Sequence, residues 1–175
     1  MSLKSTPNRY GKVAIAIHWS SALAVILAFL AGRTAAGMET VPVALLVSHI
    51  TLGLIVFILT LLRIVWWLVA DKRPAPVPGL SRFQRIGSAV VHAALYVVLV
   101  LMATSGITTI LMSGAIPAII SGEAVPGFVG LVPRSAHGIL SQILLALFML
   151  HVAAALYHQF IRRDHLLTRM GIGQA

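Results

Sequence analysis

The chain has no cysteine and very few acidic residues. Among its 175 residues Asp and Glu number 4 in total, and 10% of the residues are charged. Without cysteine the chain forms no disulfide, binds no cysteine-ligated iron–sulfur cluster and attaches no c-type haem through a C-x-x-C-H motif. So little charge cannot cover a water-soluble domain of this length, since 59% of the residues are hydrophobic. The composition therefore predicts a membrane protein.

The hydrophobic residues gather in four stretches, each long enough to cross a bilayer, which takes about 20 residues of helix. These stretches are 13–32, 42–69, 87–113 and 135–161. The first is longer than the hydrophobic region of a signal peptide, so we expect a permanent span. Since helices satisfy their own backbone hydrogen bonds in lipid, the expected fold class is all-α, a transmembrane four-helix bundle. We expect residues 1–175 to form a single membrane-embedded domain.

The formal net charge of +9 is concentrated on one side of the predicted membrane. Most of the Lys and Arg flank the same ends of the spans: Lys4, Arg9, Lys12, Lys72, Arg73, Arg82, Arg85, Arg162, Arg163 and Arg169. Only Arg33 and Arg134 flank the opposite ends, and Arg63 lies within the second span. This asymmetry predicts a multi-pass protein with both termini in the cytoplasm. The basic residues thus set the topology in the lipid bilayer, and nucleic-acid binding is not expected.

Six of the 7 histidines fall within the predicted spans: His18, His49, His92, His137, His151 and His158. Ionisable residues inside a membrane are costly and usually mark functional sites. The direction of the spans puts His49 and His137 near the outer face. Because His151 follows His137 by 14 residues, it lies about 21 Å deeper and within about 40° of the same helix face. At that depth it can meet His18 of the first span.

Two histidine pairs at two depths match two six-coordinate haems stacked across a membrane, with an imidazole on each side of each iron. Zinc fits less well, since it prefers about four ligands and often uses cysteine or carboxylate. The simpler alternative is that each histidine only forms hydrogen bonds between helices. The roles of His92 and His165 stay open.

Three other residues fit a haem-binding bundle. Gly53 and Gly106 would let a flat macrocycle approach the backbone, although ordinary helix packing also uses small residues. Arg63 follows His49 by 14 residues, which places it level with the inner histidine pair. There it can bind a haem propionate or extend to the inner headgroups.

Five segments of the chain resemble the bacterial cytochrome b561 family: AIHW (16–19), VSHITLG (47–53), RIVWW (63–67), SAHG (135–138) and LHVAAALYHQF (150–160). The resemblance implies a four-helix cytochrome of the bacterial inner membrane with two b haems. It also implies that His18 and His151 ligate the iron on the cytoplasmic side, and that His49 and His137 ligate the iron on the periplasmic side.

Within this family the chain is most similar to the superoxide oxidase type, which implies electron transfer from superoxide at the periplasmic face to ubiquinone. We expect Arg134, three residues before His137, to attract superoxide or to pair with a propionate. We expect His158, two turns below His151, to donate a hydrogen bond to a quinone carbonyl and to relay a proton. The alternative for His158 is an interfacial histidine that contacts water or a propionate.

Two other functions remain as alternatives. The chain could act as an electron-relay cytochrome b subunit docked to a separate dehydrogenase or cytochrome. It could instead be a haem-free transporter or a membrane scaffold, although the spans lack the mid-membrane breaks typical of transporters.

Overall fold

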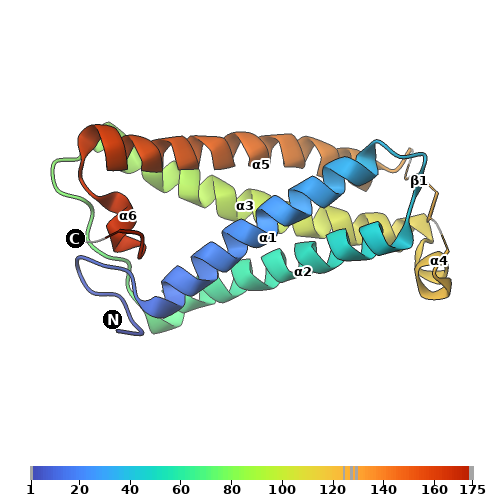
Figure 1. Ribbon diagram of the computed structural model, residues 1–175, viewed down its shortest axis with the longest axis horizontal. Helices are drawn as coiled ribbons and strands as arrows, with labels where there is room; N and C mark the ends of the chain where they lie inside the picture. The colour runs from blue at the N-terminus through green and yellow to red at the C-terminus, as the bar shows by residue number, and fades with distance from the viewer. Residues whose placement is uncertain (1, 124, 127, 129, 174–175) are drawn as a thin grey trace.

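The computed structural model describes residues 2–123, 125–126, 128 and 130–173. Its four long helices form a bundle (Figure 1): α1 (Lys12–Ala36), α2 (Val43–Val65), α3 (Arg82–Ser113) and α5 (Val132–Leu156). Two of them continue into π-helical turns, α2 into η1 (Trp66–Ala70) and α5 into η2 (Tyr157–Arg162). A short helix, α6 (Leu166–Arg169), follows near the C-terminus.

The four long helices pack as two hairpins, α1 with α2 and α3 with α5, and contacts between α2 and α3 join the hairpins. The connection from α3 to α5 contains the short helix α4 (Ile116–Ser121). Strands β1 (Thr40–Val41) and β2 (Val125–Pro126) pair antiparallel, one from each hairpin connection. Both connections lie at one end of the bundle, called here the loop end, and the two termini lie at the other (Figure 1). The β1–β2 pair therefore ties the hairpins together at the loop end.

The outside of the bundle is apolar over the length of the helices. Leu23, Ile58 and Val97 are each more than half exposed. All four long helices, with their π-helical extensions, are long and apolar enough to cross a membrane. The buried hydroxyls of Thr60 and Thr109 donate to the carbonyl four residues earlier in their own helix, at 2.7 and 2.8 Å, so both hydroxyls are hydrogen-bonded. The predicted all-α transmembrane four-helix bundle is confirmed.

The third helix begins earlier than its apolar stretch, because residues before the stretch form a capping box. Ser81 accepts a hydrogen bond from the Gln84 backbone at 3.2 Å, and the Gln84 side chain accepts one from the Ser81 backbone at 3.0 Å. These reciprocal bonds satisfy two helix-terminal N–H groups. The helix therefore starts at Arg82 rather than at 87. It ends at Gly114, whose φ of 67° is easy for glycine.

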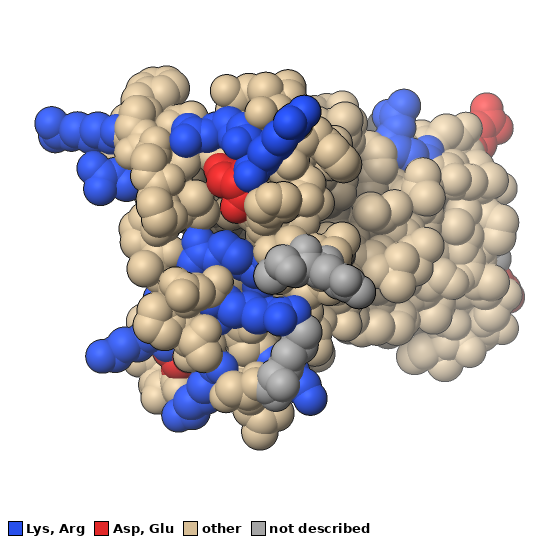
Figure 2. All heavy atoms as spheres, turned by 60° about the vertical axis from the view of Figure 1, so that its left-hand side comes forward, with Lys and Arg blue, Asp and Glu red and all other residues tan. Residues whose placement is uncertain are grey.

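Most of the Lys and Arg gather at the end of the bundle that carries the termini (Figure 2). We call this the basic end, and it comprises the segments 2–11, 71–81 and 163–173 together with the helix ends next to them, among them η2. These three segments are bound to one another. The Arg169 guanidinium donates to the carbonyls of Asn8 at 3.0 Å and Ala75 at 2.6 Å. The indole of Trp19 donates to the carbonyl of Met170 at 3.0 Å.

Asp71 is a hydrogen-bond centre of the basic end. Its carboxylate accepts from the backbone N–H of Ser5 at 2.9 Å, the hydroxyl of Ser5 at 2.8 Å, the backbone of Lys72 at 2.8 Å and the indole of Trp66 at 3.2 Å. Burial alone raises the pKa of the Asp71 carboxyl, but the hydrogen bonds donated to it outweigh burial and hold that pKa below its ordinary value. The charged carboxylate thus fastens the N-terminal segment to the end of α2.

Replacing Asp71 with Asn should lower the free energy of unfolding of the purified protein in detergent by about 1 to 3 kcal/mol, because a charged hydrogen-bond acceptor is lost. Because folding lowers the pKa of Asp71, its contribution is complete above the ordinary carboxyl pKa of about 3.9 and is lost as the pH falls through the folded value. The difference in the free energy of unfolding between wild type and Asp71→Asn should therefore be constant around neutral pH and become smaller in acid.

The matched control is Glu39→Gln, which removes an exposed carboxylate that bonds to no described residue. It should leave the melting temperature unchanged at either pH. If the difference in melting temperature between wild type and Asp71→Asn does not depend on pH, the charge of Asp71 does not contribute to stability.

Candidate functional site

The structure brings together His49 of α2 and His137 of α5 near the loop end. Their ring centres are 5.9 Å apart. The Nδ1 of His49 donates to the carbonyl of Ala28 at 2.9 Å, and the Nδ1 of His137 donates to the carbonyl of Met102 at 3.0 Å. Each ring is thus held by a backbone oxygen of the neighbouring helix in its own hairpin. We call these two residues the loop-end pair.

The structure also brings together His18 of α1 and His151 of α5, whose ring centres are 6.0 Å apart. We call them the basic-end pair. Arg63 of α2 lies beside this pair, and its Nη1 is 2.9 Å from the Nδ1 of His18. Its guanidinium also lies over the ring of Tyr96, 6.0 Å from the ring centre. Since α5 supplies one residue to each pair, both pairs bridge the two hairpins.

The spacing of both pairs fits two imidazoles on opposite sides of one metal ion. An imidazole nitrogen binds a metal at about 2 Å and the ring centre lies about 1 Å behind it, so two such rings have centres about 6 Å apart. The ring centres are 5.9 and 6.0 Å apart. The rings of each pair meet edge to face, at 65° in the basic-end pair and 81° in the loop-end pair, and ordinary edge-to-face ring pairs have the same separation. The pairs also fit a group that takes one ligand on each face, as b haem does.

The hydrogen bonds decide which ring nitrogens are free to bind a metal. In the loop-end pair each Nδ1 donates to a carbonyl, so each Nε2 keeps a free lone pair, as a metal ligand requires. His18 differs, because arginine can only donate and the Nδ1 of His18 must accept from Arg63. In this arrangement the Nε2 of His18 carries the proton. Ligation through that nitrogen requires Arg63 to move to another acceptor, and a carboxylate such as a haem propionate is the acceptor that arginine prefers.

Glycines make room for both rings of the loop-end pair. A Cβ added at Gly32 would lie 2.7 Å from Cε1 of His49, and one at Gly106 would lie 3.1 Å from Cε1 of His137. At Gly53 an added Cβ would have no heavy atom within 4 Å, so the space beside that backbone is open. Gly106 thus contacts a candidate ligand, whereas Gly53 borders space that a flat group could fill. Gly32, on α1, is a residue that the sequence did not indicate.

His92 of α3 lies next to the basic-end pair. Its ring centre is 5.1 Å from that of His151, and its Nδ1 donates to the carbonyl of Ser88 at 2.6 Å. The spacing to His151 is shorter than the spacing within the basic-end pair. His92 therefore borders the pair as a third ring. In the sequence, the only indication of this position was that His92 lies near the inner end of the third predicted span.

Arg134 lies in the first turn of α5 and is partly buried. A Cβ added at Gly138 would lie 3.4 Å from Nη1 of Arg134, so the guanidinium extends along α5 beside the turn that holds His137. This places a positive charge next to the loop-end pair.

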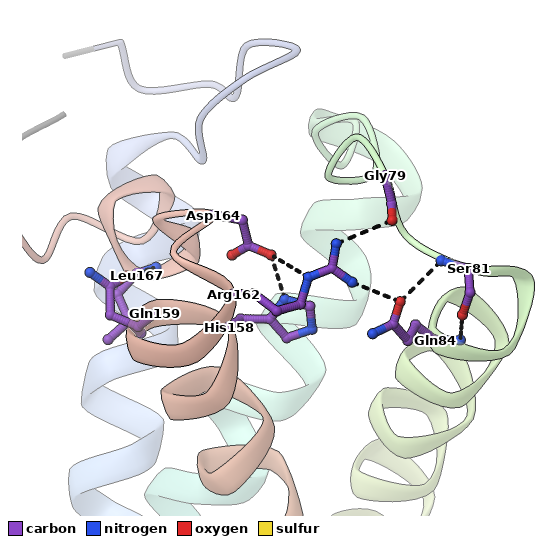
Figure 3. Close-up of polar contacts among 8 residues, drawn as sticks. All are labelled: Gly79, Ser81, Gln84, His158, Gln159, Arg162, Asp164 and Leu167. Atoms are coloured by element: carbon purple, nitrogen blue, oxygen red, sulfur yellow. Dashed lines mark hydrogen bonds and ion pairs between the residues drawn. The ribbon is translucent and has the colours of Figure 1, made fainter.

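His158 lies in η2 at the basic end, and its partner is a carboxylate. Its Nδ1 is 2.6 Å from Oδ2 of Asp164 (Figure 3). Gln159 points away from this contact, and its side chain accepts from the backbone of Leu167 at 3.2 Å. The sequence indicated His158 but not Asp164, because this contact depends on a chain reversal after α5.

Comparisons with known proteins agree with this arrangement. The family model described as prokaryotic cytochrome b561 matches residues 9–173. The chain is 27% identical to cytochrome b561 homolog 2 of Escherichia coli (strain K12) over 184 residues, an alignment that covers 97% of this chain and 95% of the relative. It is 25% identical to cytochrome b561 homolog 1 of the same organism, over 93% of this chain and 97% of the relative.

Replacing Gly32 with Ala should reduce the haem content of the purified protein. The new methyl would lie 2.7 Å from the His49 ring, which the Ala28 carbonyl holds in place, so the ring must move. The measurement is haem per chain by the pyridine haemochrome assay. The control is Gly37→Ala, where an added Cβ has its nearest neighbour at 3.9 Å and haem content should equal that of wild type. Equal haem content in both variants would show that the position of His49 does not matter for binding.

Proposed function

The chain belongs to the prokaryotic cytochrome b561 family, whose members are membrane electron-transfer proteins with b-type haem, and we propose that it is a superoxide:ubiquinone oxidoreductase. Electrons enter from superoxide at the loop end and leave to ubiquinone at the basic end. Family membership favours electron transfer over the alternative of a haem-free transporter or scaffold.

Our proposal places the protein in the bacterial inner membrane with the basic end in the cytoplasm. The support is the gathering of Lys and Arg at that end, since positively charged flanks stay on the cytoplasmic side. The loop end then faces the periplasm, and the loop-end pair is the outer pair.

The observation that carries the proposal is the presence of two imidazole pairs with the same spacing at the two ends of one bundle. His49 and His137 would hold one b haem, and His18 and His151 the other. A bound b haem supplies a reversible one-electron iron couple. The two ligand positions on α5 are 14 residues apart, which is about 21 Å of helix rise. With a haem at each pair the chain would hold two redox positions at different membrane depths.

The overall reaction balances at the two faces. Two superoxide ions each give up one electron and become dioxygen, and one ubiquinone takes two electrons and two protons and becomes ubiquinol. The loop end therefore has to attract a small anion, and the basic end has to deliver protons. Arg134 serves the first need, since its charge lies beside the loop-end pair. His158 serves the second, since an imidazole can donate a proton to a carbonyl oxygen near neutral pH.

The haem content tests the assignment of ligands. Wild-type protein should contain two b haems per chain, and His49→Ala or His137→Ala should leave one. His18→Ala or His151→Ala should also leave one, with a different optical band and midpoint potential, because the other pair remains. A wild-type content of one haem or none by pyridine extraction would refute the two-site assignment.

The two half-reactions should respond to different residues. Arg134→Glu should slow haem reduction by superoxide by about tenfold or more. Because a local attraction becomes a repulsion, the fall of this rate with rising ionic strength should disappear or reverse. Reoxidation of the reduced haem by ubiquinone should be unchanged. The matched control is Arg33→Glu, which changes the charge of the same end equally at an exposed site. Equal slowing by both variants would assign the effect to overall charge rather than to Arg134.

In protein that retains both haems, His158→Ala should slow reoxidation by ubiquinone and leave reduction by superoxide unchanged. Superoxide should still reduce the haem, while ubiquinone should reoxidise it about 100-fold more slowly, as expected for loss of an acid–base group. The control is His165→Asn, which removes an exposed imidazole at the same end and suits the positive φ of 53° at that position. Rapid reoxidation of His158→Ala would place the quinone site elsewhere.

A further inference from the structure

The carboxylate of Asp164 is held against α5 by an unusual chain reversal. After η2 the backbone adopts positive φ at two residues that are not glycine, Arg163 at 55° and His165 at 53°. Such conformations cost free energy and persist only where the surroundings require them. Between these two residues the backbone of Asp164 donates to the carbonyl of His158 at 3.2 Å. The reversal therefore returns Asp164 to the turn that carries His158.

The contact between Asp164 and His158 is enclosed and supported by a third residue. The two side chains are 13% and 15% exposed, and Nδ1 and Oδ2 are 2.6 Å apart. Nε of Arg162 lies 3.7 Å from the same Oδ2. Because the surroundings are partly shielded from water, these charges interact more strongly than they would at an open surface.

Arg162 is in turn anchored to the start of α3. Its Nη1 donates to the side-chain oxygen of Gln84 at 2.9 Å, and its Nη2 donates to the carbonyl of Gly79 at 3.1 Å (Figure 3). Gln84 is the residue that forms the α3 capping box with Ser81, so its side chain is already fixed. A continuous set of contacts thus runs from the first turn of α3 through Arg162 to Asp164 and His158.

The other aspartate of the basic end provides a contrast. Asp71 uses its carboxylate for backbone, hydroxyl and indole donors, which fasten chain segments together. The side chain of Asp164 contacts His158 and Arg162, and its Oδ1 is buried without a hydrogen bond to any described residue. The Asp164 carboxylate thus contacts two side chains of η2, whereas the Asp71 carboxylate fastens chain segments together.

The chemistry of the contact fixes the proton on one nitrogen of His158. An ionised carboxylate only accepts, so Nδ1 of His158 carries a proton and Nε2 is the nitrogen that can gain and lose one. Among the described residues Nε2 has no hydrogen-bond partner. A carboxylate on one imidazole nitrogen that orients the other nitrogen for proton transfer is a recurrent device in enzymes.

We propose that Asp164 is a positioning residue, which holds His158 with Nδ1 protonated and Nε2 free so that Nε2 delivers protons to the reduced quinone. This inference rests on the proposed function. In each delivery the protonated ring passes its Nε2 proton to a carbonyl oxygen of the quinone as electrons arrive there. The ring is left neutral with its Nδ1 proton still donated to Asp164, and cytoplasmic water returns a proton to Nε2. Two deliveries accompany two electrons and give one quinol.

The test is Asp164→Asn in full-length protein with both haems. Haem content and haem reduction by superoxide should match wild type, while the maximal rate of reoxidation by a water-soluble ubiquinone analogue falls by about tenfold or more. The quinone concentration for half-maximal rate should change little, because Asp164 acts through His158. Asp164→Glu should recover part of the rate, since it restores an acceptor. The double variant with His158→Ala should be no slower than His158→Ala alone.

Asp71→Asn is the matched control, because it removes the other carboxylate of the same end and should change stability but not the reoxidation rate. Equal slowing by both aspartate variants would assign the effect to damage of the basic end and overturn the proposal. A wild-type rate for Asp164→Asn, with His158→Ala slow, would overturn the positioning role and leave the proposed function intact. Wild-type rates for both variants would overturn the quinone site and the positioning role together.

A second measurement is independent of activity. In protein labelled with ¹⁵N-histidine, the chemical shifts of His158, assigned by their loss in His158→Ala, should show the tautomer with the proton on Nδ1. Asp164→Asn should weaken this preference, whereas Asp71→Asn should keep it. The same mixture of tautomers in wild type and Asp164→Asn would overturn the proposal even if reoxidation is slow.

Discussion

An imidazole N–H group is costly to leave unpaired inside a lipid bilayer, and hydrogen bonds through Nδ1 orient His49, His92, His137 and His158 of this bundle. Backbone carbonyls serve His49, His92 and His137 through Nδ1. A carboxylate serves His158, and Nδ1 of His18 accepts from an arginine. Where Nδ1 donates, Nε2 of the same ring is left free. In the loop-end pair both rings have a free Nε2, and the ring centres are 5.9 Å apart. The requirement for a partner thus also prepares the rings to act as ligands.

The hydrogen bonds of the loop-end pair follow the division of the bundle into two hairpins. Each ring of the loop-end pair takes its carbonyl from its own hairpin, Ala28 for His49 and Met102 for His137, while its opposite ring belongs to the other hairpin. A group bound between the rings would therefore connect halves that are otherwise joined by α2 and α3 and by the β1–β2 pair. Helix packing in lipid gains little from hydrophobic contact, so such a connection adds substantially to the cohesion of the bundle.

The helices and the histidine pairing could be predicted from the sequence because both depend on regular geometry. Helical rise and periodicity place His137 and His151 on one face of α5 at two depths, whatever surrounds them. Three features could not be predicted. Gly32 contacts His49 only through the crossing of two helices, and the bond from Arg63 to His18 depends on the same crossing. Asp164 reaches His158 through positive φ angles at residues whose identity gives no signal for them.

The contribution of α5 to both pairs has a consequence for biosynthesis. A chain is made from its N-terminus, so α1 and α2 enter the membrane with His18 and His49 before their opposite rings exist. The last long helix supplies both missing rings at once, His137 in its second turn and His151 near its other end. If the pairs are ligand pairs as proposed, neither can be complete before α5 has been made. A chain that ends before α5 has a hairpin of α1 and α2 with two unmatched imidazoles inside the bilayer, His18 and His49.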